Sequence, residues 1–439
     1  MIPFVIKHRC NPRGKINVPG DKSIAHRALL ISALARGTTQ IKNFPEHDDS
    51  LATLNALLAL GVKISTKHNC VSVYGKSRHG LCKPQKSLFV NNSGATLRLL
   101  LGILSGQNFK TKINTGKYLR LRPMSRVNIP LRLMGALIAA RKKGSQEYPP
   151  LEINGNKLKG ITYSVPVASA QVKSAILLAG LMACGKTRVM EKIATRDHTE
   201  RMLKAYGADI KIKKNEIILN PQAQLTSPGE IYIPGDISSA AFFIVWTVIS
   251  SNAQVNIESV SLNPGRLGLI HVLKRMQAKI KLIPVKNAAT KNGEPCGNII
   301  VNSSRLKATV INTQEVPSLI DELPVLMVAA CFAQGKTVIK SVGELRVKET
   351  DRINSMLTNL KRMQADIRVI KTGRREDIVI HGPCALRGAR LKSFGDHRTA
   401  MSIVVAALAA DGQSQIDDLS CVNKSFPGFL ATLKSLAKI

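Results

Sequence analysis

The sequence predicts an α/β protein of two similar domains, each made of three copies of one repeat. Three observations support this prediction. A cluster of small and polar residues precedes an apolar run six times, four of these runs end in a similar Gly turn, and a second, amphipathic stretch ends in nearly the same way in five copies. The spacing of about 65–80 residues is longer than that of an ordinary solenoid repeat.

The first element of each repeat is a predicted helix. It begins in a small polar cluster, where Ser and Asp suit helix capping, and continues through Ala, Leu, Ile and Val. The six clusters are GDKSIAHR at Gly20, NNSGATLR at Asn91, ASAQVKS at Ala168, GDISSAAF at Gly235, PSLIDELP at Pro317 and GDHRTAMS at Gly395. Because helix starts present free N–H groups and a positive dipole end, several of them meeting in one place would also bind anions.

A strand follows the first helix, and a second helix follows that strand. Four of the apolar runs end at Gly37, Gly185, Gly335 and Gly412, and alternating residues come next. Five second helices end alike, at Leu60-Gly61-Val62, Met134-Gly135-Ala136, Tyr206-Gly207-Ala208, Met276-Gln277-Ala278 and Met363-Gln364-Ala365, and the sixth is cut off at Leu436-Ala437-Lys438-Ile439. The Gly suits a left-handed helix end, after which another strand begins. Each repeat therefore contains helix, strand, helix and strand, with extra strands.

The first and fourth repeats start most alike, with Val18-Pro19-Gly20-Asp21 matching Ile233-Pro234-Gly235-Asp236. This match indicates two domains of three repeats each. If the chain crosses between domains near residue 20 and returns near residue 235, domain I is discontinuous and comprises residues 1–20 plus 236–439, and domain II comprises residues 21–235.

The net charge of +36 permits two interpretations. A basic chain of this kind is typical of a nucleic-acid-binding protein. However, the basic residues are spread along the whole chain, and aromatic residues, which would stack on bases, make up only 4%. The second interpretation is a solvated basic surface, part of which attracts an acidic substrate.

Cysteine and histidine patterns give no indication of a metal or of a disulfide framework. The eight cysteines form no C-x-x-C pair, and we expect reduced thiols, several of them, such as Cys184 and Cys331, in apolar helical stretches. No H-E-x-x-H motif occurs, so no metal site is expected. The longest apolar runs are too short to span a bilayer and no signal peptide is recognisable, so we expect a cytoplasmic protein.

Charged residues accompany the helix starts. Ser23 and Arg27 are four residues apart and share a helix face, with Lys22 at the entrance. Lys348 and Arg352 have the same spacing. Taken alone, each helix start is explained better by ordinary capping than by anion binding, whereas a surface ion network and a functional site explain Lys348, Glu349 and Arg352 equally well. Further candidates are Arg122, Glu349, Asp396, His397, Arg398 and Lys424, together with Asp321 and Glu322 inside an apolar run.

The combination of motifs resembles the 5-enolpyruvylshikimate-3-phosphate synthases. GDKSIAHR, NSGATLR, RLRPM, SAQVK, RDHTE, PSLIDELP, RVKETDR, GDHR and KSFP occur in the family's order, from about residue 5 to residue 439. The resemblance implies two domains of three βαβαββ repeats, with helices inside, sheets outside and the active site in the cleft between the domains. It implies a monomer that needs neither metal nor organic cofactor.

The implied reaction moves the enolpyruvyl group of phosphoenolpyruvate onto the 5-hydroxyl of shikimate 3-phosphate and releases phosphate. By resemblance, Asp321 takes the hydroxyl proton, Glu349 handles the proton at the methylene carbon, and Lys22 shares this work. The residues expected at shikimate 3-phosphate are Lys22, Ser23, Arg27, Ser169, Ala170, Gln171, Arg196, Asp321 and Lys348. Those expected at phosphoenolpyruvate are Lys22, Gly94, Arg122, Gln171, Arg352, Arg398 and Lys424.

The closest alternative is the enolpyruvyl transferase that acts on UDP-N-acetylglucosamine and shares this repeat architecture. That family carries a loop Cys shortly before an Arg-Pro pair, but the matching stretch from Thr115 to Pro123 contains no Cys. The alternative from another class is the nucleic-acid-binding protein, for which only the net charge argues. Sensitivity to glyphosate, which competes with phosphoenolpyruvate, stays open, since Gly94 stands where a known tolerant form has Ala.

Overall fold

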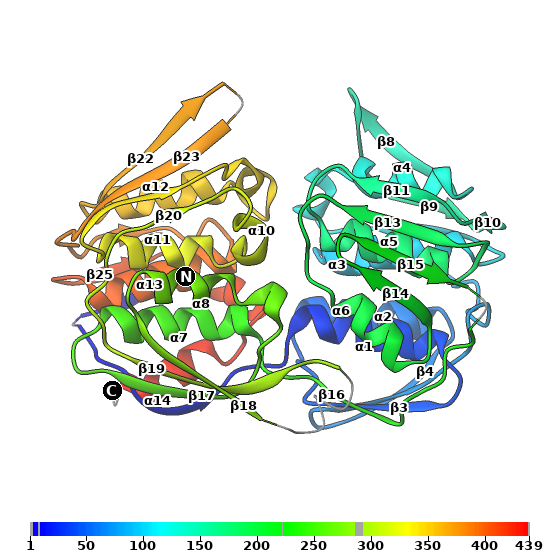
Figure 1. The fold of residues 1–439 in the computed structure, drawn as a ribbon, viewed down its shortest axis with the longest axis horizontal. Helices are drawn as coiled ribbons and strands as arrows, with labels where there is room; N and C mark the ends of the chain where they lie inside the picture. The colour runs from blue at the N-terminus through cyan, green and yellow to red at the C-terminus, as the bar shows by residue number, and fades with distance from the viewer. Residues whose placement is uncertain (1–2, 8, 222, 286–292, 374, 438–439) are drawn as a thin grey trace. The chain divides into compact units, whose positions relative to one another are not determined.

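The computed structural model describes residues 3–7, 9–221, 223–285, 293–373 and 375–437. The chain divides into two compact units (Figure 1). Unit 1 contains Met1–Pro19, Gly235–Val285 and Pro295–Ile439, and unit 2 contains Gly20–Pro234 and Lys286–Glu294. The two units have the same architecture.

Unit 2 contains three repeats, each with two helices. The first helices are α1 (Lys22–Leu34), α3 (Gly94–Ser105) and α5 (Ala170–Gly180), and the second helices are α2 (Asp48–Ala59), α4 (Ser125–Leu133) and α6 (His198–Ala205). The strands are β3 (Thr38–Lys42), β4 (Lys63–Lys67), β5 (Cys70–Tyr74), β6 (Leu88–Phe89), β7 (Lys110–Asn114), β8 (Leu137–Lys143), β9 (Gln146–Asn154), β10 (Leu158–Lys159), β11 (Thr162–Val165), β12 (Ala183–Cys184), β13 (Thr187–Glu191), β14 (Asp209–Lys213), β15 (Glu216–Asn220) and β16 (Glu230–Tyr232).

The three main sheets of unit 2 share one strand order. They run β16-β3-β5-β4, β6-β7-β9-β8 and β11-β13-β15-β14. In each sheet the first two strands are parallel and the remaining pairs are antiparallel. The outer two strands, such as β4 and β5, form a hairpin that follows the second helix of the repeat. The strand pattern therefore repeats as regularly as the helices do.

Unit 1 repeats this plan. Its helices are α7 (Ile237–Ile249), α8 (Gly268–Arg275), α10 (Val316–Leu319), α11 (Leu323–Cys331), α12 (Arg352–Arg362), α13 (His397–Ala409) and α14 (Phe429–Ala437). Its strands are β1 (Phe4–Ile6), β2 (Arg13–Asn17), β17 (Gln254–Ser261), β18 (Lys279–Val285), β19 (Cys296–Asn302), β20 (Val310–Ile311), β21 (Gly335–Ile339), β22 (Asp366–Thr372), β23 (Arg375–Gly382), β24 (Arg390–Leu391) and β25 (Ser414–Ile416).

Segments distant in sequence complete the sheets of unit 1. Two sheets have the familiar order, β18-β19-β17-β2 and β20-β21-β23-β22, and the third is β1-β25-β24. In the third sheet β1 pairs antiparallel with β25, at the place that a hairpin strand occupies in the other two sheets. Similarly, β2 lies parallel to β17, as β16 lies parallel to β3 in unit 2. The start of the chain thus belongs with its last repeats.

The first helices lie inside each unit and the sheets cover them. Every residue of α13 is buried, as are Ile237 to Val248 of α7. Helices α7, α11 and α13 pack against one another (Figure 1). The strands instead alternate buried and exposed residues, as in β9. A helix that is apolar all round must be surrounded by protein, and a strand with one polar face must border solvent. The predicted fold class is confirmed.

The predicted left-handed helix ends are confirmed in all five copies. Gly61, Gly135 and Gly207 have φ values of 80°, 107° and 81°. The two copies with Gln in place of Gly adopt the same conformation, with φ values of 72° at Gln277 and 67° at Gln364. Since a side chain is disfavoured in this region, the repeat geometry imposes the turn on both Gln residues.

One expectation about the thiols was wrong. Cys184 was expected in a helical stretch, but it is exposed and lies in the short strand β12, because α5 already ends at Gly180. Cys331 does end a helix, α11, and is buried. All eight cysteines are free thiols. Within the described ranges, every helix is too short or too polar to be a membrane-span candidate.

Candidate active site

Three capped helix starts carry most of the predicted site residues of unit 2. Asp21 Oδ1 accepts from the N–H of Ile24 at 3.0 Å at the start of α1. Ser93 and Ser169 cap α3 and α5 in the same way. The capping interpretation is therefore correct for all three starts. Capping leaves other N–H groups of each first turn available, so it is compatible with anion binding.

Polar side chains join helices α1, α2 and α3. His26 Nδ1 of α1 lies 2.7 Å from Thr53 Oγ1 of α2, and this hydroxyl lies 2.7 Å from Thr96 Oγ1 of α3. All three side chains are buried. Burial lowers the pKa of His26 to about 3. The imidazole is therefore neutral at physiological pH and acts as a hydrogen-bonding link.

Arg27 connects the first and third repeats of unit 2. Its Nη1 donates to the carbonyl of Ser23 at 2.8 Å, which agrees with the predicted shared face. Nε donates to Thr199 Oγ1 at 2.6 Å, and Nη2 donates to Ser174 Oγ at 2.8 Å. Each nitrogen has a fixed partner, so the guanidinium cannot rotate freely. Burial lowers the pKa of Arg27 to about 10, which still leaves it charged at neutral pH.

A second guanidinium, that of Arg196, lies near Arg27. The positive charge of Arg196 is one of the influences that lower the pKa of Arg27, after burial. Arg196 also follows directly after Thr195, whose carbonyl lies 3.5 Å from Nζ of buried Lys173. Two guanidinium groups held close together repel each other, and a multiply charged anion between them would relieve that repulsion.

Lys22 pairs with an acid that the sequence did not indicate. Its Nζ lies 2.9 Å from Asp49 Oδ2 of α2. Burial alone would raise the pKa of Asp49, but the Lys22 ammonium and two neighbouring imidazoles together lower it. The first residue of α1 is thereby anchored to the first turn of α2.

Gly94, Arg122 and Gln171 are brought together around another unpredicted residue, Arg98. Arg98 Nη1 donates to Gln171 Oε1 at 2.7 Å. A Cβ atom at Gly94 would lie 2.6 Å from Arg98 Nη1 and 3.0 Å from Arg122 Nη1. Both guanidinium groups therefore approach the start of α3 closely, and a side chain at position 94 would require them to shift. Arg98 lies four residues after Gly94 on the same helix face, and this spacing could have identified it.

A buried ionic cluster supports the start of α5. Lys173 Nζ lies 2.8 Å from Glu191 Oε2 and 2.6 Å from Glu200 Oε1. Only 1% of the Lys173 side chain is exposed. Burial raises the pKa of Glu200 despite the nearby Lys173 ammonium. The cluster ties α5 to β13 and α6, between which Arg196 lies.

In unit 1, the guanidinium group of Arg352 forms ion pairs with three carboxylates. Its Nη2 donates to Glu349 Oε2 at 2.6 Å, Nη1 lies 3.4 Å from Asp321 Oδ1, and Nε donates to Asp396 Oδ2 at 3.0 Å. Lys348 Nζ also lies 3.8 Å from Asp321 Oδ1. Burial would lower the pKa of Arg352, but the three carboxylates together raise it above its usual value.

The four-residue spacing of Lys348 and Arg352 does not place them on one helix face. Helix α12 begins at Arg352, and Lys348 and Glu349 precede it in the loop after a short 3₁₀ turn. The ion network is also not a surface network, because the Arg352 side chain is 2% exposed. Buried ion pairs of this kind need several partners to offset desolvation, which Arg352 has.

Arg398 and Lys424 lie around the start of α13. Asp396 Oδ1 accepts from the N–H of Arg398 at 2.7 Å, and Lys424 Nζ donates to the carbonyl of Gly395 at 3.1 Å. Arg398 Nη1 also lies 3.8 Å from Glu322 Oε1. Asp396 thus connects Arg352 to this helix start. The predicted residues of unit 1 therefore form one continuous group.

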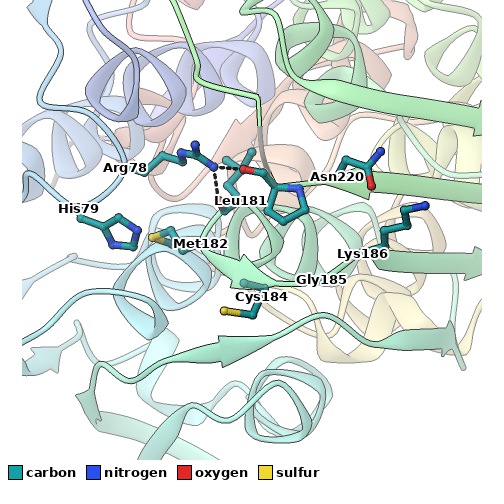
Figure 2. A pocket seen from close by; sticks show the side chains of 10 residues that line it. Arg78, His79, Leu181, Met182, Cys184, Gly185, Lys186 and Asn220 are labelled. Atoms are coloured by element: carbon teal, nitrogen blue, oxygen red, sulfur yellow. Dashed lines mark hydrogen bonds between the residues drawn. The ribbon is translucent and has the colours of Figure 1, made fainter.

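The cavity that Figure 2 shows is separate from these residues. It has a volume of about 770 Å³ and lies in unit 2, between Arg78, His79, Cys184, Lys186 and Asn220. Arg78 Nη1 donates to the carbonyl of Leu181 at 2.8 Å and also to that of Pro221. None of the predicted site residues lines this cavity. Across the described ranges, no three His, Cys, Asp or Glu side chains are grouped so that they could hold a metal ion.

Known proteins of one kind resemble the chain over its full length. A family model described as EPSP synthase (3-phosphoshikimate 1-carboxyvinyltransferase) matches residues 7–433. A 3-phosphoshikimate 1-carboxyvinyltransferase from Citrifermentans bemidjiense is 45% identical over 435 residues, which cover 99% of each chain. One from Syntrophomonas wolfei is 47% identical over 425 residues, or 97% of each chain. A solved EPSP synthase structure from Acinetobacter baumannii is 41% identical, with a TM-score of 0.86 over 100% of this chain and 98% of that chain.

Proposed function

The chain belongs to the EPSP synthase (3-phosphoshikimate 1-carboxyvinyltransferase) family, and on that premise we propose that it transfers the enolpyruvyl group of phosphoenolpyruvate to the 5-hydroxyl of shikimate 3-phosphate and releases phosphate. It is thus a transferase of the shikimate pathway, which supplies aromatic amino acids. The observation that carries the mechanistic proposal is the contact of one guanidinium, that of Arg352, with both candidate catalytic carboxylates, Asp321 and Glu349.

The reaction needs two proton transfers. The 5-hydroxyl must lose a proton, and the methylene carbon of phosphoenolpyruvate must gain one. We assign the first task to Asp321 and the second to Glu349. Their attachment to different nitrogens of Arg352 supports this division, because it holds the two carboxylates apart and gives each a fixed direction. Lys22 shares the proton work, and its contact with Asp49 fixes its position at the start of α1.

The intermediate of the reaction is strongly anionic, and fixed cations and helix dipoles would stabilise it. We propose that Arg27, Arg196, Lys348 and the starts of α1 and α5 bind shikimate 3-phosphate, with Ser23, Ser169, Ala170 and Gln171. Gly94, Arg122, Arg352, Arg398 and Lys424 would bind phosphoenolpyruvate together with Lys22 and Gln171. The fixed positions of two guanidinium groups support this assignment. Arg27 and Arg352 each have a hydrogen-bond or ion-pair partner for all three of their nitrogens.

These sets come from both parts of the chain. We propose that residues 1–20 plus 236–439 form domain I, that residues 21–235 form domain II, and that the substrates bind in the cleft between them. We also propose that the protein is a monomer and is located in the cytoplasm. The residues predicted to contact each substrate are divided between the two units. This division supports a shared cleft, because neither unit alone contains all the contacts of either substrate.

The decisive experiment measures phosphate release by the purified protein without added metal. Phosphate should appear with phosphoenolpyruvate and shikimate 3-phosphate together, and not with either alone. The product should carry the enolpyruvyl ether at the 5-hydroxyl, as mass spectrometry and NMR would show. Equal turnover with UDP-N-acetylglucosamine as the acceptor would contradict the proposal. Light scattering after gel filtration tests the monomer separately.

A further inference from the structure

Two thiols of unit 1 meet where β23 leads back to the end of α11. Cys331 is the last residue of α11 and is fully buried, and Cys384 follows β23 by two residues and is partly exposed. The N–H of Cys384 donates to the carbonyl of Cys331 at 2.6 Å. A Cβ atom at the intervening Gly382 would lie 2.4–2.9 Å from three carbonyl oxygens of this helix end. The chain therefore runs directly against the last turn of α11.

This backbone contact satisfies the first requirement of a disulfide. With standard bond lengths on both sides of a 2.6 Å N···O contact, the two Cα atoms are at most about 6.8 Å apart. Disulfides form at Cα separations of roughly 4.4–6.8 Å. The proximity arises from the fold rather than from the sequence, because the two cysteines belong to different elements.

Each sulfur lies near a backbone carbonyl at this junction, Cys331 Sγ 3.3 Å from the carbonyl oxygen of Met327 and Cys384 Sγ 3.0 Å from that of His381. The neighbouring Cys331 thiol lowers the pKa of Cys384 to about 6, and the influence of Cys384, together with burial, raises the pKa of Cys331 well above its usual value. Cys384 is thus the more acidic and more accessible thiol, and Cys331 is the less acidic and enclosed one. Redox-active cysteines typically combine an accessible thiolate with a neighbouring resolving thiol.

We propose that Cys331 and Cys384 form an oxidisable dithiol, which hydrogen peroxide converts to an intramolecular disulfide. The Cys384 sulfur attacks one peroxide oxygen, the O–O bond breaks, and the other oxygen leaves and becomes water with a solvent proton. Cys384 is then a sulfenic acid. The Cys331 sulfur attacks the Cys384 sulfur, the S–O bond breaks, and the hydroxyl leaves as water with the Cys331 proton. In total, two thiols lose two electrons and one peroxide gains them.

The test oxidises the full-length protein with hydrogen peroxide and maps its thiols. Unreduced proteolytic digestion should yield a pair of peptides joined through Cys331 and Cys384, and dithiothreitol should separate them. The oxidised protein should melt several degrees higher than the reduced protein, because the bond closes a loop of about 50 residues. Cys82 and Cys184 are exposed and provide an internal comparison for thiol reactivity.

Two variants separate the roles of the thiols. In Cys331→Ala, Cys384 should stop at the sulfenic acid, which dimedone captures. In Cys384→Ser, the linked peptide should vanish and Cys331 should stay reduced. Mapping of the unaltered protein needs no variant, so a folding defect cannot obscure the result. If peroxide oxidises Cys82 and Cys184 while Cys331 and Cys384 stay reduced, or if no peptide links them, the proposal is wrong.

Discussion

Arg352 Nη2 donates a hydrogen bond of 2.6 Å to Glu349 Oε2, at the point where the loop that carries Glu349 becomes helix α12. This contact fixes the direction of a carboxylate that we assign to proton transfer. Glu349→Gln keeps the shape and an acceptor oxygen but removes the titrating group. We expect kcat to fall by roughly 10²–10⁴-fold, with KM for both substrates changed much less.

Glu315→Gln provides the matched control, because Glu315 also pairs with an arginine, Arg275, in unit 1 but is not a predicted site residue. Its kcat should be unchanged. Asp321→Ala should resemble Glu349→Gln in its loss of kcat. Steady-state kinetics with both substrates varied would decide this, and near-normal turnover in either site variant would remove that residue from the mechanism.

A methyl group at Gly94 would disturb the contacts that we propose for phosphoenolpyruvate. In Gly94→Ala the new Cβ would lie 2.6 Å from Arg98 Nη1 and 3.0 Å from Arg122 Nη1, so both guanidinium groups must move. We expect KM for phosphoenolpyruvate to rise about tenfold, or roughly 1.4 kcal/mol, and KM for shikimate 3-phosphate to change little. Gly428→Ala is the control, because its nearest neighbour would be 3.9 Å away. Equal effects on both KM values would contradict the assignment of Gly94.

Each arginine-to-lysine change should raise the KM of one substrate more than that of the other. Arg27 donates from three nitrogens to three fixed partners, which one ammonium group cannot replace. Arg27→Lys should therefore raise KM for shikimate 3-phosphate more than KM for phosphoenolpyruvate. Arg122→Lys should show the opposite bias. The exposed Lys143→Ala should alter neither constant beyond a salt-dependent effect. If both site variants behave like Lys143→Ala, the proposed anion contacts are wrong.

Removal of Lys173 should leave two buried carboxylates without their cation. We expect Lys173→Met to reduce the free energy of unfolding by about 3–5 kcal/mol, measured by denaturant titration. The double variant Lys173→Met with Glu200→Gln should recover part of this loss, because one buried charge is then neutral. Lys42→Met, which removes an exposed pair with Glu230, should have little effect. A Lys173 variant as stable as the Lys42 variant would show that the cluster is not structurally important.

The fold was largely predictable because its signals are local. The helix ends at Gly61, Gly135 and Gly207 and the turns at Gly37 and Gly185 follow from backbone conformations that Gly favours, and all have positive φ. Long-range pairing was not predictable in this way. Nothing in residues 4–6 indicates that β1 pairs with β25, since strand propensity does not specify a partner.

In the candidate site, too, contacts within one helix could be predicted and contacts between distant residues could not. Ser23 and Arg27 could be related by their spacing within one helix, and the structure shows their contact. The partners Asp49 of Lys22 and Thr199 of Arg27 could not be predicted, because they lie 27 and 172 residues away. Only the fold brings such residues together.

His26 provides a test based on pH. Burial lowers its pKa to about 3, whereas an unfolded histidine titrates near 6.5. Between these values the unfolded chain binds a proton that the folded protein does not bind. Stability is therefore fully present above about pH 6.5 and is lost as the pH falls toward 3. His26 should account for about 1.4 kcal/mol of the loss between about pH 7.5 and 5.5.

In His26→Gln this contribution should disappear, so the free energy of unfolding should decrease less between those two pH values than in the parent protein. Gln keeps a hydrogen-bonding group for Thr53, whose hydroxyl lies 2.7 Å from His26 Nδ1. Buried His47, whose pKa burial lowers to about 4, should still contribute in the same direction, so some pH dependence must persist. His68→Gln at an exposed position is the control and should retain the parent slope. Denaturant titrations at both pH values decide the matter: equal slopes for His26→Gln and the parent would mean that His26 is protonated in the folded protein, and its role as a neutral link between α1, α2 and α3 would be wrong.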